Sequence, residues 1–292
     1  MTVVMDRLAG GLGLGLAPIG KVGDAPWRQT LHRAWELGVR LFDTAPLYGA
    51  GRAEERAGAA LADRPRDDFV LSTKAGIGPD RTPDFSYDGV MRSVAASLRR
   101  LRTERIDILY IHDPQDHHAQ AVDGAYRAAA ELRAAGVVQA VGVGMNYADA
   151  AARFVRDTDL DCVLIAGRYT LLDRSAAAEL LPLCAERGVA VVAAGVFNSG
   201  LLANPVPGAT YDYRPAPATL LDRAVRLRAV CERHGLPLAA AALQFAARHP
   251  AITATLVGAA TPDEIEQDVR WHRMAIPDRF WSDVASLDGD HQ

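Results

Sequence analysis

The chain of 292 residues is poor in cysteine and has no apolar run of membrane-spanning length. Its cysteines, Cys162, Cys184 and Cys231, lie far apart, with no CxxC motif and no histidine at zinc-site spacing. An odd number of scattered thiols predicts reduced, buried side chains. The start, MTVVMDRLAGG, lacks the basic and apolar regions of a signal peptide. We therefore expect a cytoplasmic protein without a membrane partner.

The sequence also lacks a marked excess of charge of either sign. The formal net charge is -4 at pH 7, and charged residues make up 23% of the chain. Arginine far outnumbers lysine, but the only tight basic cluster is RRLR at 99–102, which is typical of a solvated helix end. Nucleic acid is therefore not expected as a partner.

Short apolar segments alternate with longer amphipathic ones along the whole chain. The short segments are rich in Val, Ile and Leu and nearly continuous, which predicts parallel strands buried on both faces. They cover 12–17, 39–43, 68–73, 106–112, 138–144, 161–167, 189–195 and 253–259.

The intervening segments have apolar residues at helical spacing and carry helix-end signals. WRQTLHRAWELG, AYRAAAELRAAG and RSAAAELLPLCAERG each close on glycine, and YDGVMRSVAASLRRL has one apolar stripe. TPDEIEQDVRWH opens with a Thr cap, a proline and acids.

Eight strands, each followed by a helix, predict an α/β fold of the (β/α)8 TIM-barrel type in one domain over residues 1–292. A doubly wound sheet is the alternative, although it usually has fewer strands. After the seventh strand the helix is delayed by a loop at about 197–218, rich in Pro, Gly and Tyr. A loop of that length at the barrel mouth predicts a role in function.

Polar side chains stand at three successive strand ends of this barrel. Asp43, Lys74 and His112 end the second, third and fourth strands, and Tyr48 follows in the loop after Asp43. An ammonium stabilises a phenolate and lowers the pKa of the tyrosine, and a carboxylate holds the ammonium in place. We therefore predict that Asp43 pairs with Lys74, that Tyr48 exchanges a proton with substrate, and that His112 binds the same substrate oxygen.

At this point the sequence resembles the aldo-keto reductase superfamily. FDTAPLYGAGRAEERAG, LSTKAG, IDILYIHDPQ, GVGMN and VGAATPDEIEQDV are similar to its successive motifs across nearly the whole chain. The resemblance implies a nicotinamide cofactor bound without a Rossmann domain, and a catalytic tetrad formed here by Asp43, Tyr48, Lys74 and His112.

The resemblance also indicates which nicotinamide cofactor is used. Members that prefer NADP usually carry a Lys-Ser pair and an arginine that clamp the 2′-phosphate, where this chain has Gly258, Ala259 and Glu264. An acid without a clamp favours NAD over NADP, although Arg270 is close enough to compensate. Gln267 and Asp268 occupy positions that usually contact adenine.

At the nicotinamide end the chain departs from the family pattern. Asn146, or Met145, remains as the amide contact, but a strand-six glutamine is replaced by Ala166. The ring-stacking tyrosine is replaced by Ala194, so Phe197 is the candidate substitute. The expected contacts to the rest of the cofactor in this segment are Ser199, Gly200 and Leu202.

GVGMN, AGRYTLL and VFNSGLLA resemble the sub-branch of bacterial aldose 1-dehydrogenases, with L-fucose and other D-threo-aldoses as substrates, and of pyridoxal 4-dehydrogenases. The resemblance implies NAD-linked oxidation of a free aldose at its anomeric carbon, giving a lactone. The alternatives are pyridoxal 4-dehydrogenase, a broad NAD(P)H aldehyde reductase and, from another class, a non-catalytic nucleotide sensor. The intact tetrad argues against the sensor.

Several loop residues are candidates for the substrate pocket beside Tyr48 and His112. Trp27 forms either a pocket wall or a helix contact, and Tyr211 or Tyr213 brings an aromatic ring from the long loop. Asp113 either bonds a sugar hydroxyl or caps the next helix. HDPQDHH lacks metal-ligand spacing, so no metal is expected. The sequence leaves open a monomer or a small homo-oligomer.

Overall fold

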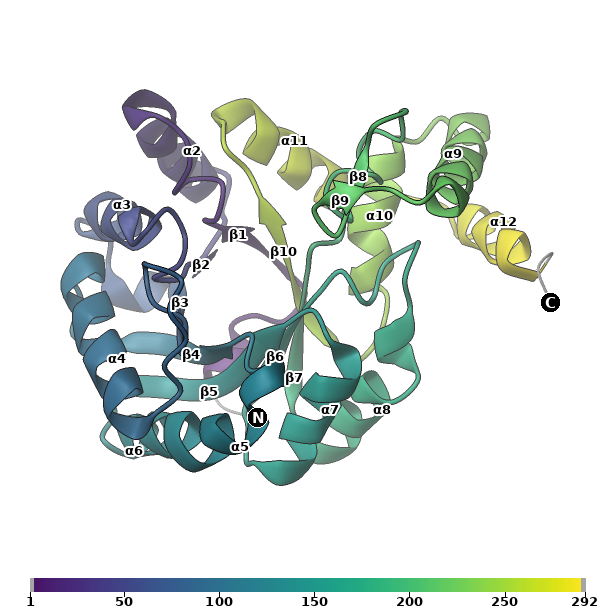
Figure 1. The fold of residues 1–292 in the computed structure, drawn as a ribbon. Coiled ribbons are helices and arrows are strands. Elements are labelled where there is room, and N and C mark those ends of the chain that lie inside the picture. The colour runs from purple at the N-terminus through teal and green to yellow at the C-terminus, as the bar shows by residue number, and fades with distance from the viewer. Residues whose placement is uncertain (1–2, 290–292) are drawn as a thin grey trace.

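In the computed structural model, which describes residues 3–289, eight parallel strands close into a barrel and helices surround it (Figure 1). The predicted (β/α)8 fold is confirmed. The hydrogen-bonded order is β1-β10-β7-β6-β5-β4-β3-β2. The strands are β1 (Gly11–Gly15), β2 (Leu41–Asp43), β3 (Val70–Ala75), β4 (Ile106–His112), β5 (Val138–Met145), β6 (Cys162–Ala166), β7 (Ala190–Ala194) and β10 (Ile252–Gly258).

The helices begin and end largely where the local signals predict. Ser86 caps α4 by accepting a hydrogen bond from the amide of Gly89, and Thr261 caps α11 through the amide of Glu264. The helices are α1 (Val3–Asp6), α2 (Asp24–Glu36), α3 (Arg52–Leu61), α4 (Tyr87–Leu101), α5 (His118–Gln120), α6 (Arg127–Ala134), α7 (Ala148–Asp157), α8 (Leu180–Arg187), α9 (Ala218–Arg233), α10 (Leu238–Ala247), α11 (Pro262–Arg273) and α12 (Asp278–Gly289).

The core has three packed layers. Side chains inside the barrel form one cluster, which includes Val4 and Met5 of α1 and Leu8, which follows α1. A larger cluster lies between the strands and the surrounding helices. The third joins α9, α10 and α12 and includes Phe280. Burial removes apolar side chains from water in all three layers, which is the main stabilising contribution in such a fold.

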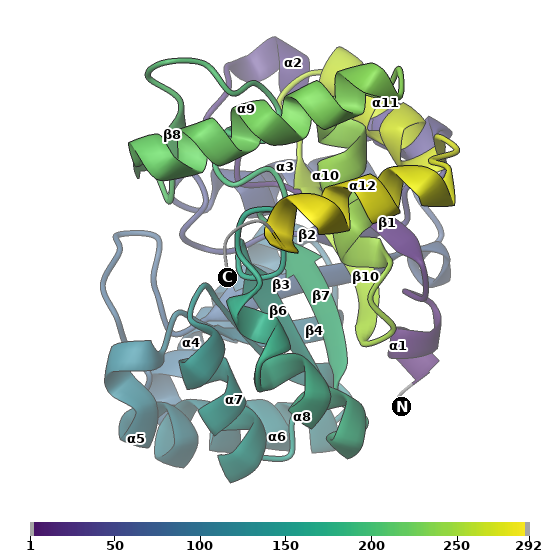
Figure 2. The same ribbon diagram turned by 90° about the vertical axis from the view of Figure 1, so that its right-hand side faces the viewer.

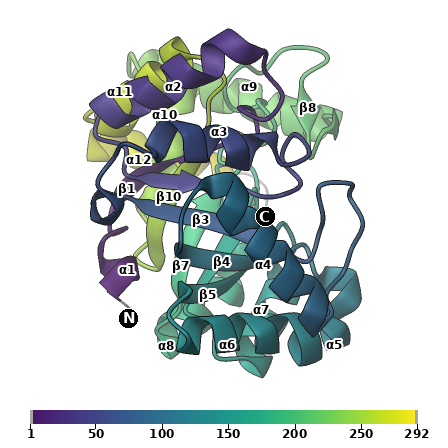
Figure 3. The ribbon, with the colours of Figure 1, turned by 90° about the vertical axis from the view of Figure 1, so that its left-hand side faces the viewer.

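The two ends of the barrel differ in what closes them. Figures 2 and 3, seen from opposite sides, place α1 at one end and the hairpin of β8 (Thr210–Tyr211) and β9 (Arg214–Pro215) at the other. The loop between β3 and α4 projects on the same side as the hairpin. The hairpin and this loop both follow the C-terminal residues of strands, so they lie at the end of the barrel where active sites of this fold are found.

The loop after β7 is more structured than the sequence indicates. The predicted irregular segment at about 197–218 contains the hairpin β8–β9, and two helices, α9 and α10, precede the last strand instead of one. In the described part of the chain no helix is long and apolar enough to cross a membrane. The cysteines are free and buried, as predicted, and burial raises the pKa of Cys184 and Cys231 to about 12.

Candidate active site

A cavity of about 760 Å3 opens at the C-terminal end of the barrel. Lys74 and His112 reach it from the ends of β3 and β4, and Tyr48 lines it from the loop after β2. Parallel strands in a closed barrel bring these positions together although they are far apart in the sequence. The structure thus places side chains of acid, base and hydrogen-bonding type around one space.

Lys74 is held by two oxygen acceptors. Its Nζ donates to Asp43 Oδ2 at 2.6 Å and to the Thr44 carbonyl oxygen at 2.8 Å. Ser72 donates to the other oxygen of Asp43 at 2.7 Å. Asp43 and Lys74 are 3% and 2% exposed, so each needs the other to remain charged. The predicted pairing of Asp43 with Lys74 is present.

Tyr48 and His112 lie next to this pair. Lys74 Nζ is 4.9 Å from the centre of the Tyr48 ring, and the rings of Tyr48 and His112 meet edge to face at 5.9 Å. The Tyr48 loop is fixed by a close approach of two glycines, because a Cβ on Gly49 would lie 2.2 Å from the carbonyl oxygen of Gly20. Gly49 also has a φ of 62°, which a larger side chain would strain.

Burial is the largest single influence on the pKa values of Tyr48, Lys74 and His112. Burial raises the pKa of Tyr48 above its usual 10, and Lys74 only partly offsets this, so the expected lowering is wrong for the protein alone. Burial also disfavours the Lys74 ammonium, but Asp43 and Tyr48 raise its pKa overall. Burial, assisted by Lys74, lowers the pKa of His112 to about 3. His112 is therefore a neutral hydrogen-bonding group, and Tyr48 a protonated phenol, at neutral pH.

The predicted cofactor contacts divide into two sets. Asn146 and Ser199 line the cavity, whereas Gly200 and Leu202 do not. The Leu202 side chain is fully buried in the core, and its amide donates to the Phe197 carbonyl, so neither faces a ligand. Phe197 packs edge to face on Trp271 rather than lining the cavity, so it does not replace the missing aromatic ring at Ala194.

The residues predicted around the adenosine end lie on β10 and α11, outside the lining of this cavity. Glu264 is exposed, and its carboxylate accepts a hydrogen bond from the Ala260 amide at 2.6 Å. Gly258 and Gln267 are exposed, whereas Asp268 is 4% exposed. Burial and the neighbouring Glu264 raise the pKa of Asp268 to about 7.

The predicted substrate walls are only partly in place. Trp27 is 7% exposed and packs in the core, with the Arg56 guanidinium 5.5 Å from its ring centre, so the helix-contact interpretation holds. Tyr211 does not line the cavity, because its hydroxyl donates to Asp173 Oδ2 at 2.9 Å. Tyr213 does line it and is 88% exposed. Asp113 lines it as well.

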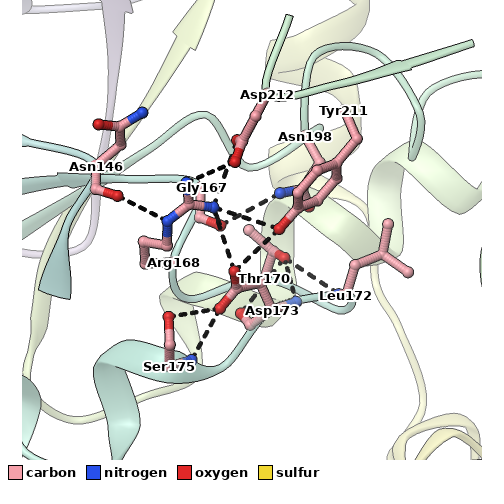
Figure 4. A network of polar contacts seen from close by, with 10 residues as sticks. All are labelled: Asn146, Gly167, Arg168, Thr170, Leu172, Asp173, Ser175, Asn198, Tyr211 and Asp212. Atoms are coloured by element: carbon pink, nitrogen blue, oxygen red, sulfur yellow. Dashed lines mark hydrogen bonds and ion pairs between the residues drawn. The ribbon is translucent and has the colours of Figure 1, made fainter. Parts of the chain in front are cut away.

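Sequence reasoning missed Arg168, which joins three loops at the cavity rim (Figure 4). Its guanidinium donates to the Asn146 carbonyl at 2.7 Å, to Asp173 at 3.2 Å and to Asp212 at 2.6 Å. Asp212 lies in the turn of the β8–β9 hairpin, so Arg168 fastens that hairpin over the loops after β5 and β6. The signal available in the sequence was the position of this charged residue, two residues after the buried strand β6.

Lysine is rare in this chain, and the lysines that it has lie at the cavity. The chain has two lysines, Lys21 and Lys74, and both line the cavity. Lys74 is buried within the ion pair, whereas Lys21 is exposed at the rim.

Comparisons with known proteins agree with this geometry. Residues 11–288 match the aldo/keto reductase family. The D-threo-aldose 1-dehydrogenase of a Pseudomonas species is 41% identical over 94% of this chain and 92% of its own length. The pyridoxal 4-dehydrogenase of Microbacterium luteolum is also 41% identical, over 94% of this chain and 93% of its own. The holo form of aldo-keto reductase AKR11C1 from Bacillus halodurans has a TM-score of 0.80 at 27% identity, covering 94% of this chain and 91% of that one.

Proposed function

The chain belongs to the aldo-keto reductase family, a family of oxidoreductases that use nicotinamide cofactors, and we propose that it oxidises the anomeric carbon of a free aldose to a lactone with NAD. The observation that carries this proposal is the meeting of Tyr48, the Lys74–Asp43 pair and neutral His112 in one cavity. The similarity to a D-threo-aldose 1-dehydrogenase supports an aldose of the L-fucose type.

Each side chain has a distinct part in the proposed reaction. Tyr48 in its ionised form accepts the proton of the anomeric hydroxyl, and Lys74 stabilises the phenolate. Asp43 keeps Lys74 charged and in place. His112 donates a hydrogen bond to the same oxygen as it becomes a carbonyl. The hydrogen on the anomeric carbon leaves as hydride, so the two electrons and the proton of the oxidation are both accounted for.

The residues present fit a nicotinamide cofactor, which when bound supplies the hydride acceptor. Asn146 and Asn198 both line the cavity and offer side-chain amides. The buried Oδ1 of Asn198 has no hydrogen-bond partner among the described residues, so an acceptor is free for a ligand amide. Glu264, an exposed acid on α11, supports NAD because a 2′-phosphate would meet its negative charge.

Pyridoxal oxidation is the second candidate. A pyridoxal 4-dehydrogenase shares 41% identity with this chain, the same value as the aldose enzyme. The cyclic hemiacetal of pyridoxal also carries a hydroxyl on an oxidisable carbon, so the same four side chains suffice. Turnover with L-fucose, other free aldoses and pyridoxal, followed by absorbance of the reduced nicotinamide with NAD and with NADP, separates the two substrates and the two cofactors.

Tyr48→Phe is expected to reduce the oxidation rate about 100-fold or more, because the variant keeps the ring but loses the proton acceptor. NAD binding, followed by fluorescence quenching, should survive. In the unaltered enzyme the rate of oxidation should rise with pH toward pH 10, since only the ionised phenol accepts a proton and burial raises its pKa. Tyr147→Phe, at an exposed tyrosine, is the control. An unchanged rate for Tyr48→Phe contradicts the proposed role.

A further inference from the structure

The carboxyl group of Asp113 has no structural partner that explains its position. The expected helix cap is absent, because the short helix at Gln115–His117 begins at Pro114 without a side-chain cap. Among the described residues no hydrogen bond reaches the Asp113 carboxylate, and the nearest basic atom is His112 Nε2 at 3.7 Å. The side chain is 37% exposed and lines the cavity.

The backbone at Asp113 is held in an unfavourable conformation that keeps this side chain at the cavity. Its φ is 46°, in the left-handed region that few non-glycine residues adopt. The Asp113 amide donates to the Gly144 carbonyl at 2.9 Å, which ties the residue to the end of β5. Strain of this kind, when the surroundings maintain it, commonly marks a functional residue.

The chemistry of the neighbouring groups defines what Asp113 can bind. A carboxylate is a hydrogen-bond acceptor, and burial, partly opposed by Lys74, raises its pKa to about 6, so it is mainly ionised at neutral pH. His112 and Asp113 line the same cavity, with His112 Nε2 3.7 Å from Asp113 Oδ2. A substrate oxygen on His112 therefore leaves Asp113 facing the next position of the substrate, where it requires a hydrogen-bond donor.

We propose that Asp113 accepts a hydrogen bond from the hydroxyl group on the carbon adjacent to the reacting carbon, and so selects substrates that carry hydroxyls on both carbons. The proposal rests on the proposed function and narrows its substrate class to sugars hydroxylated at the second carbon. Asp113 is then a residue of specificity and not of proton transfer. A simple aldehyde or a 2-deoxy sugar would leave its carboxylate without a donor.

The test measures kcat/KM of each enzyme variant on two sugars that differ only in the hydroxyl group on the second carbon. Asp113→Ala and the more conservative Asp113→Asn are compared with the unaltered enzyme. The substrates are an aldose that the unaltered enzyme oxidises and the 2-deoxy form of the same aldose. For Asp113→Ala we expect kcat/KM to fall about ten- to hundredfold on the aldose, the range for a hydrogen bond to a charged group, and to change less than about threefold on the 2-deoxy sugar. On the aldose, kcat/KM of Asp113→Asn should lie between the values of Asp113→Ala and the unaltered enzyme. Asp116→Asn, an exposed acid three residues on, is the matched control.

The outcomes separate the two proposals. An equal loss on both sugars, at unchanged melting temperature and NAD binding, overturns the role of Asp113 while aldose oxidation stands. A selective loss on the hydroxylated sugar supports it. Turnover of pyridoxal with no aldose activity in the unaltered enzyme overturns the proposed function and this inference together, because pyridoxal has no hydroxyl on the adjacent carbon.

Discussion

Asp268 shows what it costs to bury a carboxyl group without a partner. It is 4% exposed, and among the described residues its side chain forms no hydrogen bond or ion pair. Burial, together with repulsion from Glu264 one helical turn earlier, raises the pKa of Asp268 to about 7. An acid kept in such a place destabilises the ionised protein, which is common where a ligand is to be bound.

The free energy of unfolding should therefore depend on pH through Asp268. Because the folded pKa lies above the unfolded value of 3.8, the folded chain binds the proton more tightly, and stability falls as pH rises from about 4 to 7. Asp268→Asn should remove this dependence and stabilise the protein at pH 8 by about 2 to 4 kcal/mol. Urea unfolding at pH 5.5 and pH 8 measures the free energy of unfolding of both proteins. Asp263→Asn, an exposed acid on the same helix, is the control. A loss of stability at pH 8 for Asp268→Asn would show that an unseen partner holds the carboxylate.

At the level of elements, the β8–β9 hairpin depends on contacts from outside itself. Two-residue strands give it little internal stability, and both turn residues, Asp212 and Tyr213, have positive φ. Arg168 binds Asp212, and the Ser199 hydroxyl accepts a hydrogen bond from the Tyr213 amide at 3.1 Å. The position of Tyr213 over the cavity thus depends on a residue that follows another strand.

Arg168→Ala should release the hairpin, because it removes the cation that Asp173 and Asp212 share. We expect KM for substrate to rise about tenfold or more and the free energy of unfolding to fall by about 3 kcal/mol. Arg168→Lys should restore little, since one ammonium cannot reach three loops at once. Steady-state kinetics and urea unfolding give both values. Arg214→Ala, at an exposed arginine of the same hairpin, should change neither. Unchanged kinetics for Arg168→Ala would mean that the hairpin is held by other contacts.

The barrel elements could be predicted because their signals are local. The strands are continuous apolar runs, and helix α11 carries its Thr cap and first-turn proline in sequence. The hairpin could not, because Tyr211 and Tyr213 have no apolar alternation and their conformation is imposed by Arg168 and Ser199. Element boundaries follow local chemistry, whereas the loop follows contacts with distant segments.

Over the whole molecule, the part of the site at strand ends was predictable and the part on loops was not. Asp43, Lys74 and His112 converge because the barrel brings successive strand ends together. No feature of the sequence around Trp27 shows whether its side chain lines the substrate pocket or packs in the core. The packing in the structure shows that it lies in the core. The protonation state of Tyr48 could not be predicted from the sequence either, because it depends on the extent of burial.

The placement of both lysines at the cavity has a practical consequence for the whole protein. Lys74 is 2% exposed, so Lys21 is the accessible side-chain amine among the described residues. Among the side-chain amines an amine-reactive ester should acylate Lys21 first, at the cavity rim, and reduce activity, whereas Lys21→Arg should resist this loss. Mass spectrometry and residual activity after labelling report it. Equal inactivation of Lys21→Arg would place the sensitive group elsewhere.

A resin that couples through lysine would therefore bind this protein by the rim of its own cavity and turn the opening toward the support. Most proteins carry amines over their whole surface and attach in many orientations. Attachment of this chain through its lysines would have one orientation, through Lys21, and that orientation blocks the substrate. Coupling through carboxylates, which are spread over the helices, would give many orientations, including ones in which the cavity faces the solution.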